Sequence, residues 1–400
     1  MTILLMDWPA CGSETVKKVF AQLGHRVEIF DFPQRSHETT HGEELGVAIV
    51  EKILETGAEV IFSFNYFPVI ATAVHACRKK YISWIYDSPA VLLYSMTVFF
   101  PENYIFHFDS YEVERMRREG VEHVWYLPLA ANVEEYDAMI PGEKQRKQYN
   151  ADIAMVGSMY RGKFKYFDKY TGFDDYLKGY LDAVVATQEK IYGMNFLQEV
   201  LTPEIMQRVL KTVPLMEEKG DSYDSAEWDF ANYYLAMRVA AQEREHMLQA
   251  LAEHYDVALY TDGETKNLPK VRNMGGVDYY REAPYAMKCA KINLNISLRS
   301  IRTGIPQRVM DIMGCGGFVL SNYQADLCDA FVADEDFVYY ESIEDAVDKA
   351  GYYLEHEEER RQIAENGYRK VKEQHRFAEK CEQMLAAAMG ERGQAYESEI

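Results

Sequence analysis

The stretch KINLNISLRSIRTGIPQRVMDIMGCGGFVLSN (residues 291–322) carries the clearest information on the fold. It contains an apolar strand candidate (291–297), a loop, a helix candidate (305–314) and a second strand candidate (316–322). A strand, a helix and a strand in this order form a crossover unit of a parallel sheet. We therefore expect a doubly wound α/β domain here, with ligands at the carboxyl ends of its strands.

The first third of the chain shows the same alternation. Helix candidates separate strand candidates at 2–7, 25–31, 58–64, 81–87, 103–109 and 121–129. This pattern predicts a second doubly wound sheet. Its expected strand ends carry a rim of polar residues and one glycine, which either face a ligand or simply begin loops: Asp7, Gly12, Asn65, Asp87 and Asp109.

Two segments interrupt the alternation. The polar segment 134–150 has Pro141-Gly142 in its middle and is interpreted as a linker, so the first domain is expected at 1–140. The second is expected at 151–351, with a tyrosine-rich helical insertion at 160–235. The insertion either contacts an acceptor or a second subunit, or only packs around the second domain.

Composition excludes several classes of function. The chain has 400 residues, a net charge of −21 and no run of 18 apolar residues, which disfavours non-specific nucleic-acid binding and a membrane span. Its six cysteines form no CxxC pair, so neither a disulfide framework nor a zinc site is expected, and the absence of a basic leader favours the cytoplasm. Neither G-x-G-x-x-G after the first strand nor a P-loop motif is present, which argues against a dinucleotide cofactor and a P-loop ATPase.

A basic island lies in this acidic chain. Residues 283–310 contain no Asp or Glu and five basic residues, namely Lys288, Lys291, Arg299, Arg302 and Arg308. The loop before the helix combines guanidinium groups, Gly304 and a helix N-terminus, which together favour a phosphate or diphosphate ligand. The alternative is that the arginines pair with carboxylates elsewhere in the chain.

The same residues resemble a known family, the CgeB-like spore-maturation proteins, which are grouped with GT-B-type glycosyltransferases. The similar run is R-x-x-R-x-G-I-P-x-R-V-x-D-I-x-G-x-G-G-F followed by L-S-N, from Arg299 to Asn322. The N-terminal half resembles the domain that accompanies it, through IYDSP (85–89), 106–121 and YLPLAAN (126–132).

This resemblance implies two Rossmann-like domains that face each other across a cleft. The donor, a nucleotide-diphosphate sugar, would bind the second domain and a protein or glycan acceptor the first, while helices in 352–390 cross back to the first domain. Asp311 matches a carboxylate that holds the donor ribose in many retaining enzymes. Thr303 stands where the partner glutamate of that motif would be, so an inverting or a retaining outcome stays open.

The predicted reaction is therefore a metal-independent glycosyl transfer without a cofactor. Arg302 and Arg308 are assigned to the diphosphate, and Asp87 either acts as general base or caps a helix that begins at Pro89. The remaining predicted substrate contacts are Arg161, Tyr260, Thr261, Asn295, Arg299, Thr303, Gly304, Asp311, Gly316, Gly317 and Asn322. A sugar-nucleotide epimerase, a non-catalytic surface or spore assembly protein, and a homo-oligomeric state stay open.

Overall fold

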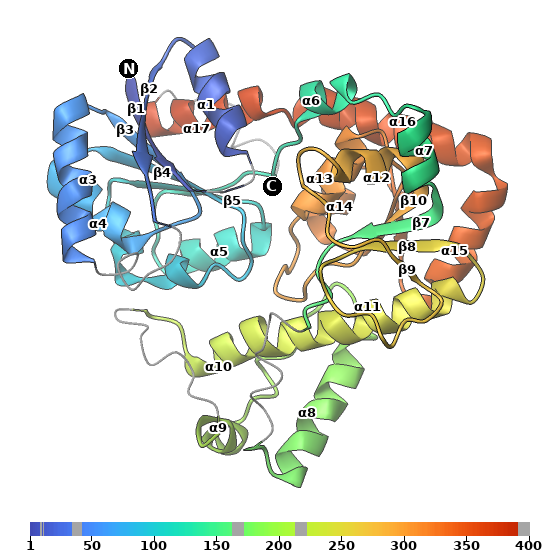
Figure 1. Cartoon of the computed structure of the whole chain (residues 1–400). Helices are drawn as coiled ribbons and strands as arrows, with labels where there is room; N and C mark the ends of the chain where they lie inside the picture. The colour runs from blue at the N-terminus through green and yellow to red at the C-terminus, as the bar shows by residue number, and fades with distance from the viewer. Residues whose placement is uncertain (9, 11, 34–41, 162–171, 213–221, 391–400) are drawn as a thin grey trace. The chain divides into compact units, whose positions relative to one another are not determined.

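The computed structural model describes residues 1–8, 10, 12–33, 42–161, 172–212 and 222–390 (Figure 1). These residues form two compact units. The N-terminal unit contains the described residues of 1–132, 222–224 and 374–390, and the C-terminal unit those of 133–212 and 225–373.

The N-terminal unit is built on a parallel six-stranded sheet of order β2-β1-β3-β4-β5-β6. Its strands are β1 (Thr2–Asp7), β2 (Arg26–Asp31), β3 (Val60–Phe64), β4 (Lys80–Ile85), β5 (Asn103–His107) and β6 (Val124–Tyr126). Its helices are α1 (Ser13–Gln22), α3 (Glu43–Thr56), α4 (Pro68–Cys77), α5 (Ser110–Arg118) and α17 (Phe377–Met389), with 3₁₀ turns at Val91–Tyr94 and Met96–Phe99. The central strands are mostly apolar, with Ser63 and Ser83 as buried exceptions, because helices bury both faces.

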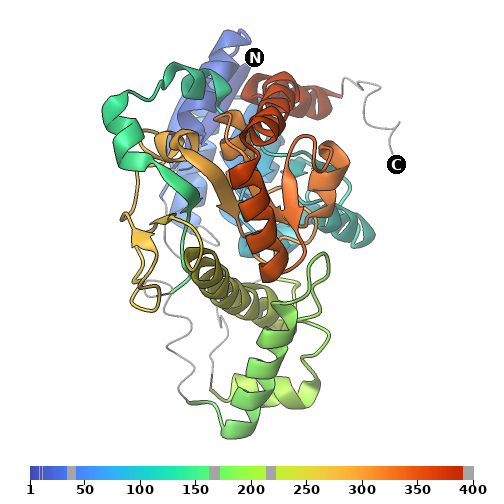
Figure 2. The ribbon, with the colours of Figure 1, turned by 90° about the vertical axis from the view of Figure 1, so that its right-hand side faces the viewer.

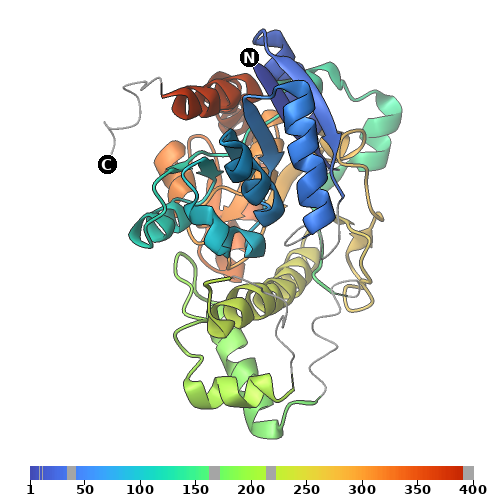
Figure 3. The same ribbon diagram turned by 90° about the vertical axis from the view of Figure 1, so that its left-hand side faces the viewer.

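Helices cover the two faces of this first sheet. Figure 3 shows α3 and α4 side by side on one face, and α17 packs beside α1. The loop before α1 permits this approach because Gly12 has φ +102°, and a Cβ there would lie 2.9 Å from the ring of Phe377. The last helix thus belongs to the N-terminal unit, although α16 (Glu357–Gln374) lies in the C-terminal unit up to Glu373.

The C-terminal unit contains a second parallel sheet of order β12-β11-β10-β7-β8-β9. Its strands are β7 (Ala151–Val156), β8 (Val257–Tyr260), β9 (Arg272–Asn273), β10 (Ala290–Asn295), β11 (Val319–Asn322) and β12 (Val338–Tyr340). Among its helices are α12 (Ala283–Cys289), α13 (Gln307–Gly314), α14 (Ala325–Ala330) and α15 (Ile343–Glu355). The strand order reverses between β7 and β10, which makes their carboxyl ends the switch point where open α/β sheets bind ligands.

The predicted linker at 134–150 is wrong. This segment forms two helices of the C-terminal unit, α6 (Val133–Ala138) and α7 (Glu143–Tyr149). The aromatic rings of Tyr136 and Tyr149 are buried, and Asp137 pairs with Lys372 at 2.9 Å. Val133 is buried as well, and the segment is polar because most other residues of the two short helices face solvent.

The tyrosine-rich region forms a helical subdomain with α8 (Asp175–Gln188), α9 (Pro203–Leu210), α10 (Ala226–Asp229), a π-helical turn (Phe230–Leu235) and α11 (Ala236–Ala252). Figures 1 and 2 show α8 and α9 on the side of α11 away from the sheet. These helices share a separate apolar core. The predicted boundary 160–235 differs in one respect, because residues 222–224 belong to the N-terminal unit, where Asp224 pairs with Arg115.

Candidate functional site

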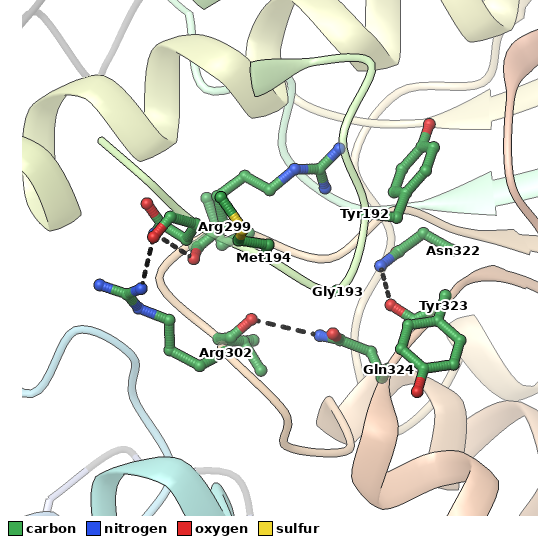
Figure 4. A pocket seen from close by; sticks show the side chains of 11 residues that line it. Tyr192, Gly193, Met194, Arg299, Arg302, Asn322, Tyr323 and Gln324 are labelled. Carbon is green, nitrogen blue, oxygen red and sulfur yellow. Dashed lines mark hydrogen bonds between the residues drawn. The ribbon is translucent and has the colours of Figure 1, made fainter. Parts of the chain in front are cut away.

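A pocket lies beside the switch point of the second sheet (Figure 4). Three segments that are far apart in the sequence form its wall: the loop after β10, the residues that follow β11, and a turn between α8 and α9. The lining residues are Tyr192, Gly193, Met194, Asn195, Leu298, Arg299, Ile301, Arg302, Asn322, Tyr323 and Gln324. Of the predicted site residues, the structure therefore brings Arg299, Arg302 and Asn322 into one pocket.

Arg302 lies at the pocket wall with its side chain partly exposed. Its Nη1 donates a hydrogen bond of 2.7 Å to the carbonyl oxygen of Asn195. A carbonyl is a neutral acceptor, so this hydrogen bond does not itself neutralise the guanidinium. Arg302 is therefore suited to bind an anionic group.

Arg308, on the first turn of α13, has a carboxylate partner. Its Nη1 lies 3.3 Å from Oδ2 of Asp311, and its guanidinium lies 5.6 Å from the centre of the Tyr279 ring. The side chain remains 24% exposed. An anion reaching Arg308 would thus compete with Asp311.

Arg299 is an internal ion-pair residue. It is 6% exposed and its Nη2 lies 2.9 Å from Oε2 of the fully buried Glu243. Its guanidinium also lies over the ring of Tyr192 at 4.6 Å. Burial raises the pKa of the Glu243 carboxyl, and the nearby Arg299 cation opposes this increase. Burial alone would lower the pKa of Arg299, but the interactions with Glu243 and its other neighbours together raise it. Arg299 therefore follows the alternative to the anion site, in which an arginine of the basic island pairs with a carboxylate elsewhere in the chain.

Asp311 is enclosed by protein donors rather than open to a ligand. It is 1% exposed, and its Oδ1 accepts hydrogen bonds from Tyr136 (2.9 Å), Tyr279 (2.8 Å) and Gln307 (2.8 Å). Two of these donors are hydroxyls, the same chemistry that a ribose would offer. A ribose would have to displace them to reach Asp311 in the way that the family resemblance implies.

The glycines at the end of α13 make a tight turn into β11. Gly316 has φ +74°, and a Cβ on Gly317 would lie 2.7 Å from Nδ2 of Asn293. Gly304 lies buried in the loop after β10, where the carbonyl of Thr303 accepts from the amide of Asp326 at 3.0 Å. The left-handed backbone thus accounts for Gly316 and packing accounts for Gly317, and backbone contact with a ligand stays a prediction.

Two predicted asparagines connect neighbouring strand ends. Asn295 donates to the hydroxyls of Ser297 (3.1 Å) and Ser321 (2.9 Å). Asn322 accepts from the amide of Ser297 at 2.8 Å and is 2% exposed. Both side chains fix the shape of the loop after β10.

The other predicted contacts lie at the ends of β7 and β8. Arg161 is exposed and pairs with Glu245 at 2.5 Å. Burial raises the pKa of Tyr260 to about 12, and Thr261 accepts from the amide of Gly263 at 3.3 Å. Tyr260 and Thr261 are both buried, so neither presents an open surface to the base of a nucleotide.

Asp87 follows β4 in the N-terminal unit and is exposed. Its Oδ2 accepts from Nδ2 of Asn65 at 2.7 Å, and Oδ1 of Asn65 accepts from the amide of Asp87 at 3.1 Å. Surrounding protein raises the pKa of the Asp87 carboxyl, and the hydrogen bond from Asn65 opposes this increase. The alternative role as a cap is wrong, since the next helical turn is Val91–Tyr94 with Ala90 at its N-terminal cap.

Sequence reasoning missed Arg244, which bridges the two strand ends at the switch point. Its guanidinium donates to the carbonyl of Ser158 after β7 and to that of Ile296 after β10, the latter at 2.5 Å. It also lies over the ring of Tyr160 at 4.6 Å. The available signal was a charged pair, Glu243-Arg244, among the apolar positions of a long helix.

Within the part of the chain that the structure describes, no group of three or more His, Cys, Asp or Glu side chains could hold a metal ion. No helix among the described residues is long and apolar enough to cross a membrane.

The chain is similar to known proteins in two ways. A family model described as glycosyl transferase-like matches residues 242–386, which include the loop after β10. No curated protein sequence matches the chain.

Among solved structures, HepE of Anabaena in complex with UDP and glucose aligns over 98% of this chain and 100% of its own, with TM-score 0.57 and 11% identity. A glycosyltransferase from Rickettsia africae aligns over 97% and 98%, with TM-score 0.56 and 11% identity. Sucrose-phosphate synthase from Thermosynechococcus elongatus aligns over 98% of both chains, with TM-score 0.56 and 11% identity. The expected fold class is confirmed: this chain has the GT-B fold of these glycosyltransferases, and its residues 242–386 match the glycosyl transferase-like family.

Proposed function

We propose that the protein is a glycosyltransferase that moves a sugar from a nucleotide-diphosphate sugar to a hydroxyl group of a protein or glycan. The observation that carries this proposal is the position of Arg302. It lies inside the family match, on the loop after β10, at the switch point of a GT-B sheet.

The donor site in this proposal uses the positive charge of that loop. Departure of a nucleoside diphosphate builds negative charge on its oxygens, and fixed cationic donors lower the barrier most effectively. Arg302 contacts the diphosphate, and the N-terminus of the eight-residue helix α13 adds backbone amides on the same side. Arg308 contributes after exchanging its contact with Asp311 for the ligand.

The reaction is proposed to proceed without a metal or other cofactor, because guanidinium groups supply the charge that a divalent cation would otherwise provide. Activity that is unchanged by EDTA would agree with this assignment. Activity that EDTA abolishes and Mg²⁺ restores would contradict it.

The acceptor is assigned to the N-terminal unit, with Asp87 as the general base of an inverting transfer. A base of this kind must be ionised at the working pH and must accept a proton from the acceptor hydroxyl. A raised pKa makes the Asp87 carboxylate a stronger base, while its contact with Asn65 fixes its orientation.

The finer family assignment is also a proposal. We infer that the chain groups with the CgeB-like proteins, which is supported by the residues from Arg299 to Asn322. A cytoplasmic location is supported by the six scattered cysteines. The exposed ring of Tyr176 on α8 supports the helical subdomain as the contact surface of a homo-oligomer.

The test is a calorimetric titration with UDP-, GDP-, TDP- and CMP-sugars, using wild type, Arg302→Ala and Arg208→Ala. Arg208 is a matched control because it is an arginine of the C-terminal unit that pairs with Asp174, outside the pocket. We expect saturable binding of one diphosphate sugar, lost only in Arg302→Ala. No binding across the panel would favour the assembly protein, and conversion of the sugar nucleotide without an acceptor would favour the epimerase.

A further inference from the structure

The turn between α8 and α9 is a built structure rather than a passive surface. The fully buried amide of Gln188 organises it by donating to the carbonyls of Ile191 (3.2 Å) and Met194 (2.8 Å) and accepting from the amide of Phe196 (3.0 Å). Gly193 has φ +72°, and a Cβ there would lie 3.0 Å from the ring of Tyr323. The turn is therefore fixed both internally and against the residue that follows β11.

Asn195 joins this turn to the arginine-bearing loop at two points. Its Nδ2 donates to the carbonyl of Arg299 at 2.6 Å, and its own carbonyl accepts from Nη1 of Arg302 at 2.7 Å. Its Oδ1 accepts from the amide of Leu197 at 2.9 Å. The backbone carbonyl, Nδ2 and Oδ1 of Asn195 thus all have protein partners. Asn195 is 5% exposed, and Figure 4 shows its neighbours Gly193 and Met194 beside Arg299.

The Asn195 carbonyl holds one end of the Arg302 guanidinium. Arg302 belongs to a loop of the sheet, yet its hydrogen-bond acceptor comes from the helical subdomain, 107 residues earlier in the chain. A long side chain that is held in one direction loses less freedom when it binds an anion, which increases affinity.

We propose that Asn195 is a positioning residue of the donor site, which holds Arg302 toward the diphosphate of the nucleotide sugar. This inference rests on the proposed function and deepens it. It assigns to the helical subdomain a direct role in donor binding. The sequence alone had suggested contact with an acceptor, contact with a second subunit, or packing.

The experiment uses full-length protein with Asn195→Ala, Arg302→Ala and the double variant. Asn293→Ala is the matched control, since Asn293 is a buried asparagine of the same unit that donates to the carbonyl of Met287 and does not touch the turn. The probes are UDP and inorganic pyrophosphate, measured by calorimetry. Hydrogen exchange of peptides covering 296–306 reports the loop without any ligand.

Asn195→Ala keeps the backbone carbonyl that accepts from Arg302 but removes the side-chain hydrogen bonds that hold this carbonyl in place. We therefore expect it to accelerate exchange in 296–306 and to weaken the binding of both probes roughly two- to tenfold, about the effect of losing one neutral hydrogen bond. The double variant should bind no more weakly than Arg302→Ala, because Asn195 acts through that arginine. With a donor identified, the KM for the donor should rise and the KM for the acceptor should stay constant.

Different results separate the two proposals. If Asn195→Ala binds both probes as wild type does, or if its effect adds to that of Arg302→Ala, the positioning role is refuted and the proposed function stands. If Asn293→Ala weakens binding equally, the effect is general destabilisation and the inference fails. If wild type binds neither probe nor any sugar nucleotide, both proposals fail together.

Discussion

Replacing Arg299 with methionine tests whether this arginine supports the fold or binds a ligand. The change keeps the apolar length of the side chain and removes the partner of Glu243, which is fully buried and 2.9 Å away. Breaking a buried ion pair from one side costs roughly 3–5 kcal/mol, because the remaining charge has no compensation. Loss of the cation over the Tyr192 ring adds about 1 kcal/mol.

The assay is hydrogen exchange of the α11 peptides, which contain Glu243 and report the C-terminal unit alone. Since 1.36 kcal/mol corresponds to a factor of ten, exchange through global opening should accelerate by roughly three to four orders of magnitude. Removing Arg299 raises the pKa of Glu243 further. A raised carboxyl pKa favours the folded state at low pH. The loss of stability should therefore grow as the pH rises above the ordinary pKa of a glutamic acid.

Two controls make the result specific. Arg299→Met/Glu243→Gln removes both charges, so it should recover part of the lost stability and abolish the added pH dependence. Arg208→Met breaks a surface pair in which Arg208 is 36% exposed and should change stability by less than about 1 kcal/mol. If Arg299→Met exchanges as wild type does and loses sugar-nucleotide binding, Arg299 is a ligand contact and the structural assignment is refuted.

Three further predictions concern packing and titration. Gly317→Ala places a methyl group 2.7 Å from a side-chain nitrogen and should lower the melting temperature by the equivalent of roughly 1–3 kcal/mol, whereas Gly179→Ala, with nothing within 4 Å, should not; equal melting temperatures would contradict the packing account. Asn65→Ala removes a hydrogen bond that lowers the pKa of Asp87, so the acid limb of the pH–rate profile should move to higher pH, and an unmoved limb would argue against Asp87 as the base. Burial lowers the pKa of Lys380 to about 8 from 10.5, so urea unfolding of the N-terminal unit should require more denaturant as the pH rises between these values. Lys380→Met should remove this rise, and a rise that persists would contradict it.

The secondary structure was predictable because each sheet is buried on both faces. Strands such as β3 and β10 appear in the sequence as short apolar runs between turn residues, and the structure places them at Val60–Phe64 and Ala290–Asn295. The two-residue strand β9 gives no such run and was not predicted. Glycine also gave reliable information, since Gly57 ends α3 in the left-handed conformation at φ 65°.

The linker at 134–150 shows where composition misleads. Its charges and its Pro-Gly pair are as typical of a solvated helical surface as of a flexible connection. What distinguishes the two is contact with distant parts of the chain, such as the buried hydrogen bond from the Tyr136 hydroxyl to Asp311 at 2.9 Å, which joins residues 175 positions apart. A pattern confined to a short window contains no information on such a partner.

The same reasoning separates Arg299 from Arg302, which are three residues apart in one loop and were both predicted to contact the donor, Arg302 at its diphosphate. Both arginines have partners from the helical subdomain: Glu243 on α11 pairs with Arg299 in the interior, while the backbone carbonyl of Asn195 accepts a hydrogen bond from Arg302 at the pocket wall. A basic island therefore identifies the loop, and the burial of each arginine separates the internal ion-pair residue from the one at the pocket wall. Because Arg302 lies partly exposed at the pocket wall while Arg299 belongs to a buried ion pair, Arg302 is the residue of this pair whose replacement should change ligand binding more than folding.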